Sequence, residues 1–249
     1  MKALRMVILL VVVALAPTMA WAAAPGSGIQ GTSHDFSSKG GGVGLCTFCH
    51  TPHKAISTAL LWNHTLSTNN FSWDAPTTTA GTTYPAFKGD TYKGPTAKCL
   101  SCHDGSVAVG DIAWWQEGKP ASLDNTKHGA GDSMNVGFGG AMGGNHPVAM
   151  PYPYLGAANT YNGATTSSKA IGGYGFVPGE WQATPVGPIR LFNDDGAGNI
   201  TAGPVASKTG IECSTCHDPH NKASVDDLFL RGNMKGTDTT YICLKCHVK

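Results

Sequence analysis

Cysteine and histidine recur along the chain in one fixed spacing. The pattern Cys-x-x-Cys-His occurs four times and uses all eight cysteines of the 249 residues. The two thiols of such a pair can add across the vinyl groups of one porphyrin, and the adjacent imidazole then becomes an axial ligand of the iron. We therefore expect four covalently bound haem c groups. The attachment residues are Cys46, Cys49, Cys99, Cys102, Cys213, Cys216, Cys243 and Cys246, and the proximal iron ligands are His50, His103, His217 and His247.

Three other uses of cysteine compete with haem attachment. Zinc sites do not call for a histidine directly after every cysteine pair. Redox-active dithiols usually accompany a thioredoxin-like βαβ pattern, which the sequence lacks. Disulfides are common in exported proteins, but they do not require this spacing. The four complete motifs therefore favour haem c at each cysteine pair.

Each haem iron needs a ligand on its second face, which histidine or methionine can supply. Ten histidines are present, and six remain once four are assigned as proximal ligands. Six are enough for bis-histidine ligation of all four irons. We expect the distal ligands to be His34, His53, His146 and His220, with His64 and His128 as second-choice candidates. The methionines expected to pack instead are Met134, Met142, Met150 and Met234.

The stretch CTFCHTPH at 46–53 carries a second histidine close behind the first. The far axial position of an iron bound by His50 lies about 4 Å across the porphyrin, if each iron–nitrogen bond is about 2 Å. Three residues cannot wind around the porphyrin plane, and Pro52 disfavours helix at Thr51. His53 must therefore serve a different iron, which requires two haems close together. CSTCHDPH at 213–220 repeats the arrangement with His220.

The four motifs form an internal repeat. Each copy has a CxxCHxPH motif followed by a CLxCH motif, the first copy at 46 and 99 and the second at 213 and 243. We interpret the copies as two di-haem modules. The expected organisation is a signal peptide at 1–22, a first di-haem module at 23–103, a loop-rich insertion with a hairpin at 104–212, and a second di-haem module at 213–249.

The first residues have the pattern of an export signal. Lys2 and Arg5 precede an apolar run at 6–16, and Ala20-Trp21-Ala22 offers small residues for cleavage. The apolar run is too short to span a bilayer, and no later segment is apolar enough to do so. We expect an exported protein with no transmembrane segment. The chain carries a net charge of +1, so we expect no basic face for nucleic acid.

The composition predicts little regular structure. The chain has 33 glycines and 15 prolines, and only 13% of its residues are charged. Glycine favours turns and proline interrupts hydrogen-bonded ladders, so side chains alone would bury little apolar surface. We expect a coil-rich multihaem cytochrome c fold, with short helices at the CxxCH motifs, a few short strands and a haem-packed core.

Three local features of the insertion can be predicted. Residues 188–192 are expected to form the first strand of a hairpin and 194–198 its turn. Ile200 is expected to begin the second strand. The stretch 155–175 has the composition of a surface loop. Trp114 and Trp115 are expected to pack against the edge of a haem.

The sequence resembles the doubled-CxxCH multihaem c-type cytochrome family. The resemblance runs from SHDFSS through CTFCHTPHKA, LLWNHT, CLSCHDGSVAVGD, NHPV and CSTCHDPHN to the terminal CLKCHVK, a span that covers most of the chain after residue 22. Within the family it is similar to extracellular tetrahaem filament (nanowire) cytochromes of the outer-membrane cytochrome E type. This resemblance implies head-to-tail filaments of copies of the chain, with His53 of one copy ligating a haem of the next.

The expected activity is electron transfer rather than catalysis. Iron with two histidine ligands has no open position for a substrate, so we expect no enzyme. The resemblance implies an extracellular or cell-surface filament that exchanges electrons with partner cytochromes and extracellular acceptors. One alternative is a monomeric periplasmic shuttle. Another, favoured less, is a multihaem oxyanion reductase, which would need one iron with an open position.

Overall fold

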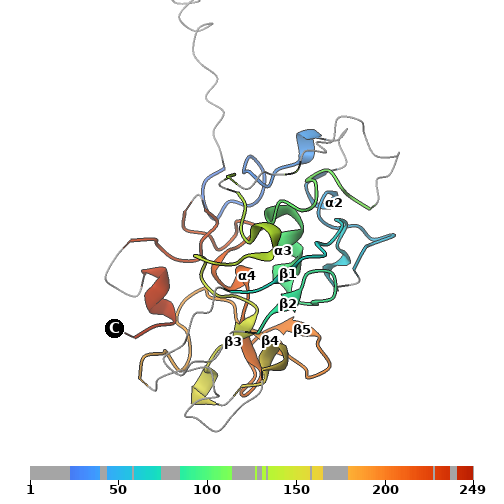
Figure 1. The fold of residues 1–249 in the computed structure, drawn as a ribbon. Helices are drawn as coiled ribbons and strands as arrows, with labels where there is room; N and C mark the ends of the chain where they lie inside the picture. The colour runs from blue at the N-terminus through green and yellow to red at the C-terminus, as the bar shows by residue number, and fades with distance from the viewer. Residues whose placement is uncertain are drawn as a thin grey trace, which may run out of the picture.

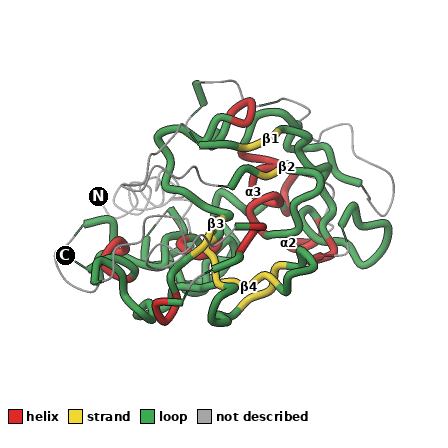
Figure 2. Tube along the Cα trace, turned by 60° about the horizontal axis from the view of Figure 1, so that its bottom comes forward, coloured by secondary structure: helices red, strands yellow, loops and turns green. Residues whose placement is uncertain are grey.

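Most of the chain runs as coil between short helical turns and small strands (Figures 1 and 2). The computed structural model describes residues 23–39, 44–57, 59–73, 85–113, 127, 131–132, 134–157, 159–164, 179–226, 228–235 and 240–248. The expectation of a coil-rich fold with short helices and few strands is confirmed. The expected signal peptide at 1–22, His128, and the Trp114–Trp115 pair lie outside the described residues.

A helical turn forms at every CxxCH motif. The four turns are α2 (Gly44–Thr47), α3 (Pro95–His103), α4 (Cys213–Cys216) and the 3-10 helix η6 (Ile242–Lys245). α3 is the longest of the four, and Pro95 occupies its first turn, where a missing N–H costs no hydrogen bond. The other described 3-10 turns are η1 (Ser37–Lys39), η2 (Ala59–Leu61), η3 (Phe138–Gly140), η4 (Tyr154–Gly156) and η5 (Tyr161–Gly163).

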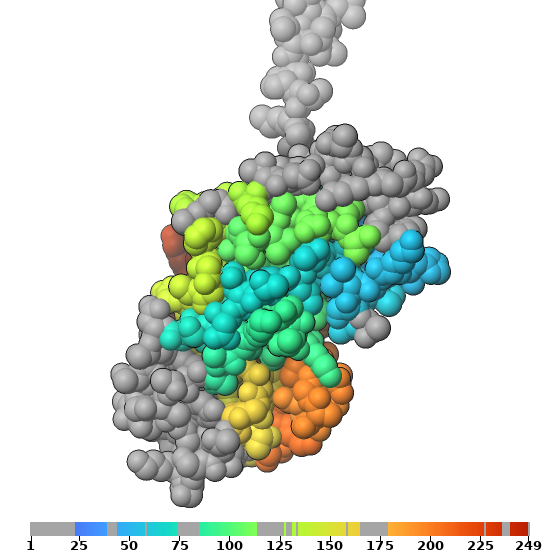
Figure 3. Space-filling view, turned by 45° about the vertical axis from the view of Figure 1, so that its right-hand side comes forward, coloured from blue at the N-terminus to red at the C-terminus, as the bar shows by residue number. Residues whose placement is uncertain are grey.

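The described strands form two antiparallel sheets. β1 (Asn70–Phe71) pairs with β2 (Phe87–Lys88). The larger sheet has the order β3-β6-β4-β5, from β3 (Met150–Pro151), β4 (Phe192–Asp194), β5 (Ile200–Ala202) and β6 (Thr209–Ile211). In the space-filling view, chain segments of this sheet, coloured yellow and orange, lie together at one end of the molecule (Figure 3). β6 leads through one residue into α4, so the sheet positions the third haem-attachment motif.

The hairpin of the insertion lies further along the chain than the sequence predicted. Its first strand is β4, and residues 188–191 are coil. Pro188 has no N–H to donate to a sheet, which explains the later start. Asp194 pairs with Ile200 in the observed register, and the Asp195 carboxylate accepts hydrogen bonds from the N–H groups of Ala197 (2.7 Å) and Asn199 (3.0 Å). The turn therefore occupies 195–199.

The stretch 155–175 was expected to be a surface loop, and its described part is not entirely exposed. Asn159 is 1% exposed and Tyr161 is fully buried. The Asn159 side-chain amide donates to the carbonyl of Tyr152 at 2.7 Å and also to that of Thr209. Polar composition was a poor guide here, because the asparagine satisfies backbone carbonyls inside the fold rather than facing water.

Apolar side chains gather in small separate clusters. The largest has seven buried members: Phe71, Phe87, Tyr92, Ala97, Leu100, Met142 and Ala149. A second lies on the larger sheet around Met150, Tyr152, Leu191 and Ile211. Met142 and Met150 thus pack as expected, whereas Met134 and Met234 are exposed. No helix in the described part of the chain is long and apolar enough to cross a bilayer.

Candidate haem-binding site

The four CxxCH motifs each form a helical turn that closes on the first cysteine. The N–H of the histidine donates to the carbonyl of the first cysteine in the motifs of His50 (2.8 Å), His217 (3.0 Å) and His247 (2.9 Å), and His103 ends the regular helix α3. Residues three and four apart on a helical turn are neighbours. Each motif therefore brings two thiols and one imidazole together, which is the arrangement that covalent haem attachment needs.

Burial affects the second cysteine of every pair in the same way. All eight cysteines lie in the described part of the chain as free thiols. Burial raises the pKa of the second cysteine in every pair, to about 11 for Cys49 and Cys246 and to about 12 for Cys102 and Cys216. The first cysteine of the third pair differs, because hydrogen bonding to Cys99 lowers the pKa of the Cys213 thiol. The histidine after every pair, rather than the thiol pKa, is therefore what points to haem attachment.

Backbone carbonyls orient three of the proximal imidazoles. The Nδ1 of His50 lies 2.6 Å from the carbonyl oxygen of Leu60, that of His103 lies 2.8 Å from Met134, and that of His217 lies 2.9 Å from Leu228. Nδ1 next to a carbonyl is the protonated nitrogen, so Nε2 keeps its lone pair. Histidine ligands of metals usually make this second hydrogen bond, because it fixes the tautomer and the ring orientation.

Three proximal histidines each lie opposite one of the expected distal histidines. The ring centres are 6.2 Å apart for His50 and His220, and also 6.2 Å apart for His103 and His34. For His247 and His146 they are 6.4 Å apart. Metal–imidazole bonds are about 2 Å long and a ring nitrogen lies about 1 Å from its ring centre, so two imidazoles on one iron place their centres about 6 Å apart. The three pairs have the spacing that one iron between the rings requires.

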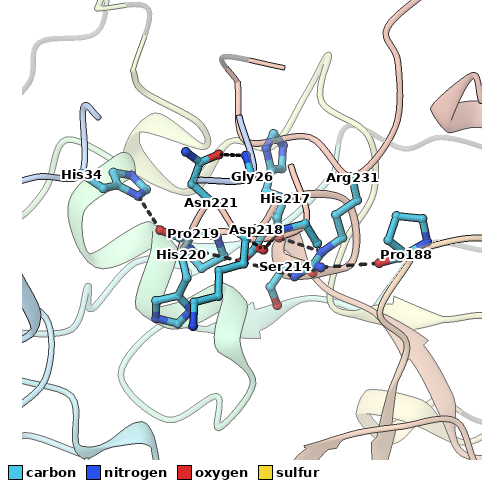
Figure 4. Close-up of polar contacts among 12 residues, drawn as sticks. Gly26, His34, Pro188, Ser214, His217, Asp218, Pro219, His220, Asn221 and Arg231 are labelled. Atoms are coloured by element: carbon cyan, nitrogen blue, oxygen red, sulfur yellow. Dashed lines mark hydrogen bonds and ion pairs between the residues drawn. The ribbon is translucent and has the colours of Figure 1, made fainter. Parts of the chain in front are cut away.

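Burial favours the neutral imidazole in two of the distal histidines, His34 and His220, because it lowers their pKa. Burial lowers the pKa of His34, although the carbonyl of Pro219, 3.4 Å from its Nδ1, works in the opposite direction (Figure 4). Desolvation likewise lowers the pKa of His220, although the Asp218 carboxylate opposes it. Iron binds the neutral form of imidazole, so these pKa shifts favour ligation.

His64 has a different environment from the other described histidines. It is 1% exposed, with Nδ1 3.0 Å from the carbonyl oxygen of Thr65 and Nε2 3.1 Å from that of Val109. Both ring nitrogens therefore lie next to backbone carbonyl oxygens inside the fold. The geometry favours a structural role for His64 over the ligand role considered from the sequence.

The two remaining site residues, His53 and His217, are exposed, as are His146 and His220. The N–H of His53 donates to the Thr51 hydroxyl at 3.3 Å, and that hydroxyl donates to the carbonyl of His53 at 2.8 Å. Within the described ranges the structure shows no imidazole pair at His217.

Comparison with known protein families concerns the third and fourth CxxCH motifs. A protein-family model described as "Doubled CXXCH motif" matches residues 203–249, which contain the third and fourth attachment motifs. No curated protein matches the chain. The match supports a multihaem c-type cytochrome with covalently bound haem c. The attachment turns, the free thiols and the oriented imidazoles fit that cofactor.

The first CxxCHxPH motif is closed by a returning loop that the sequence did not reveal. The N–H of Thr51 donates to the carbonyl of Leu61 at 2.8 Å, and the N–H of Asn63 donates to that of Cys49 at 2.9 Å. The buried Asn63 side chain donates to the carbonyl of Thr47 at 2.8 Å, and Thr47 lies between the two cysteines in sequence. This loop fixes both ends of the attachment turn.

A returning loop closes the second CxxCHxPH motif in the same way, with different side chains. The N–H of Asp218 donates to the carbonyl of Phe229 at 2.7 Å, and the N–H of Arg231 donates to that of Cys216 at 2.8 Å. The Arg231 side chain takes the place of the asparagine, with Nε donating to the carbonyl of Ser214 at 3.2 Å (Figure 4). Its guanidinium also lies 3.6 Å from the Asp218 carboxylate, and both side chains are buried.

Substitution of Arg231 by methionine is expected to lower the free energy of unfolding of the haem-loaded protein by about 3 kcal/mol or more. The loss leaves the buried Asp218 carboxylate without its counter-charge and the carbonyl of Ser214 without its side-chain donor. Chemical denaturation followed by far-ultraviolet circular dichroism measures the change. Arg190→Met is the matched control, because Arg190 is exposed and its backbone N–H, 3.4 Å from the carbonyl of Thr215, is kept. Equal losses in the two variants would contradict the argument.

Proposed function

We propose that the chain is a tetrahaem c-type cytochrome that conducts electrons through closely packed haems with two histidine ligands each. The observation that carries this proposal is the set of three proximal–distal imidazole pairs with ring centres 6.2–6.4 Å apart. Haem iron supplies one-electron chemistry when it is bound. Two protein ligands on each iron leave no position for a substrate, so the protein acts as an electron carrier and not as an enzyme.

The chain's own residues hold the imidazoles in place for this role. Carbonyl oxygens fix the Nδ1 side of His50, His103 and His217, which leaves Nε2 as the ligand atom. Exposed leucines flank two of these histidines: Leu60 is 57% exposed and Leu228 is 55% exposed. Apolar side chains beside the ligand can cover the face of a porphyrin and exclude water from it.

Close packing of haems follows from one of the pairs. His220 lies three residues after His217 in sequence, yet its ring lies opposite His50 of the first motif. The same short segment thus belongs to the attachment site of the third haem and to the ligand set of the first. Two haems that share so short a segment lie close together, and short separations favour electron transfer between them.

We further propose that the protein is exported and polymerises head to tail into an extracellular nanowire for long-range electron transfer. The support is the resemblance to filament cytochromes and the finding that, among the described residues, no imidazole lies opposite the exposed His217. His53 of one copy would ligate the iron at His217 of the next copy. A monomeric periplasmic shuttle is the alternative function. An oxyanion reductase has less support, because three of the proximal histidines lie opposite a second imidazole.

Purified secreted protein can be used to test both parts of the proposal, which are electron conduction through four haems and polymerisation into filaments. Mass spectrometry should show four covalently bound haems, and electron paramagnetic resonance should show only low-spin ferric iron. Electron microscopy should show filaments. Fewer than four haems or a high-spin ferric centre would contradict the conductor, whereas four low-spin haems without filaments would favour the shuttle.

His53→Ala should abolish filaments and leave four haems attached. Its exposed neighbour Lys54 provides the matched control, and Lys54→Ala should keep filaments of normal length. Electron microscopy and haem-to-protein ratios measure both outcomes. Normal filaments from the His53 variant would exclude this residue from the junction.

A further inference from the structure

Glu212 is a fully buried carboxylate that lies directly before the third attachment motif. One carboxylate oxygen, Oε1, accepts hydrogen bonds from the hydroxyls of Tyr92 and Tyr161. The other, Oε2, accepts one from the N–H of Thr96 at 3.0 Å. Glu212 follows β6 directly, and it connects this strand with the turn η5 and with the segment that leads from Tyr92 into α3, which lie far apart in sequence.

Each of the two tyrosine rings packs directly against a glycine, at a position where a larger residue would collide with the ring. A Cβ on Gly210 would lie 2.3 Å from the ring of Tyr161, and a Cβ on Gly94 would lie 2.4 Å from that of Tyr92. Both tyrosines are buried. The packing therefore holds each hydroxyl towards the same carboxylate oxygen.

The same contacts join two attachment helices at their first residues. Thr96 lies in the first turn of α3, and Glu212 immediately precedes α4. The Thr96 hydroxyl accepts a hydrogen bond from the N–H of Cys213 at 3.1 Å. The side chains of Cys99 and Cys213 lie within hydrogen-bonding distance of each other, so the second and third haems would be attached at adjacent points.

Glu212 also places a charge beside these attachment points. Burial raises the pKa of Glu212, and the hydrogen bonds from Thr96, Tyr161 and Tyr92 oppose that rise. Each of those groups donates to the carboxylate, which is the pattern that an ionised carboxylate needs. Lys98 is a buried cation near Glu212, and burial lowers its pKa while the Glu212 carboxylate opposes the change. Charges inside the protein are screened much less than surface charges, so each acts on a haem attached nearby.

We propose that Glu212 is a positioning residue that clamps the second and third haem-attachment helices together, and that its charge lowers the reduction potential of the haems attached there. The inference rests on the proposed electron-transfer function and assigns to that function a residue that binds no iron. A negative charge next to a haem favours the ferric state over the ferrous state, because reduction adds an electron. Lys98 acts on the same haems with the opposite sign.

Glu212→Gln in the haem-loaded protein removes the charge and keeps the side-chain shape. A potentiometric titration should show at least one haem whose reduction equilibrium constant rises about tenfold, which is about 59 mV for one electron. The split Soret circular dichroism of neighbouring haems should also change, because it reports their relative orientation. Asp195→Asn is the matched control: it removes an exposed carboxylate from the β4–β5 turn and should change each constant by less than twofold.

Lys98→Met provides an independent test of how the sign of a buried charge affects the haem reduction potential. It removes the positive charge from the same region and should lower the reduction equilibrium constant of a haem about tenfold. If the Glu212 variant fails to accumulate with four haems, the Lys98 variant decides: a downward change supports the proposal, and no change overturns it. Unchanged potentials and an unchanged Soret signal in a four-haem Glu212→Gln protein also overturn it. Wild-type protein without four low-spin haems would instead refute the proposed function.

Discussion

Replacing His220 by alanine is expected, in the proposed tetrahaem protein, to convert one haem from the low-spin to the high-spin ferric state and to leave the other three unchanged. The ring of His220 lies 6.2 Å from that of His50, at an interplanar angle of 26°. Loss of this imidazole opens the second face of the iron at the first attachment motif. Electron paramagnetic resonance should give one high-spin centre per chain, and the reduced protein should bind one carbon monoxide.

The position of the altered haem tests the pairing itself. Because His220 cannot reach the iron beneath His217, the affected haem should be the one on Cys46 and Cys49. Carbon monoxide bound to a haem on the proteolytic fragment that contains Cys213 would contradict this assignment.

His220→Met refines the same test. Methionine in the distal position raises a haem potential, within the range of about 0.8 V over which axial ligands act. The expected result is one haem with a strongly raised potential and no high-spin signal. A protein with four unchanged potentials would show that His220 binds no iron.

His64→Ala is the matched control for these variants. His64 is buried with both ring nitrogens next to carbonyl oxygens, so its loss should leave all four irons low-spin. The cost should appear in stability instead, at about 1–3 kcal/mol for buried polar groups that lose a partner. A high-spin centre in this variant would show that the structural role assigned to His64 is mistaken.

The attachment turns could be predicted from sequence because their chemistry is local. Two thiols and one imidazole must meet one porphyrin, so the spacing of Cys46, Cys49 and His50 is set within five residues. The helical turn at each motif follows from the same requirement. Glycine and proline content likewise predicted a coil-rich fold, because these residues restrict helices and strands wherever they lie.

The partner of each distal histidine could not be predicted in this way. Sequence spacing showed that His220 cannot share an iron with His217, but it did not select His50 from the other three proximal histidines. That choice depends on how segments far apart in the chain pack together. Tyr161 illustrates the same limit: its burial depends on Gly210 and on the Glu212 carboxylate, about 50 residues further along the chain.

The sequence analysis did not find the returning loops that close the two CxxCHxPH motifs, although the sequence contains a signal for them. Leu60-Leu61-Trp62-Asn63 and Leu228-Phe229-Leu230-Arg231 occupy equivalent places in the two copies. Leu61 and Phe229 both have positive φ, 52° and 59°. Extending the internal repeat about ten residues beyond the second histidine would have found both loops. The change from asparagine to arginine hides the match, since the two side chains share only the ability to donate to a carbonyl.

Substituting all eight cysteines by alanine is expected to abolish cooperative folding of the chain. Described core clusters are small, with seven buried residues in the largest. Ordering each residue costs about 1–2 kcal/mol of conformational entropy, and coil connected by short turns recovers little of it. Leu60, Leu228 and other large apolar side chains remain exposed in the polypeptide alone. Near-ultraviolet circular dichroism and a thermal scan should show no fixed tertiary packing and no cooperative transition.

Removing one haem should have a local effect by comparison. Cys46→Ala with Cys49→Ala deletes the first haem but leaves Glu212, its two tyrosines and the α3–α4 contact unchanged. Limited proteolysis should then cut within 44–64 while the remaining chain resists. The difference separates two sources of order: haems stabilise the coil around each motif, whereas the buried carboxylate and the small sheet hold the centre together. Cooperative melting of the eight-alanine protein at the wild-type temperature would show that the polypeptide provides both.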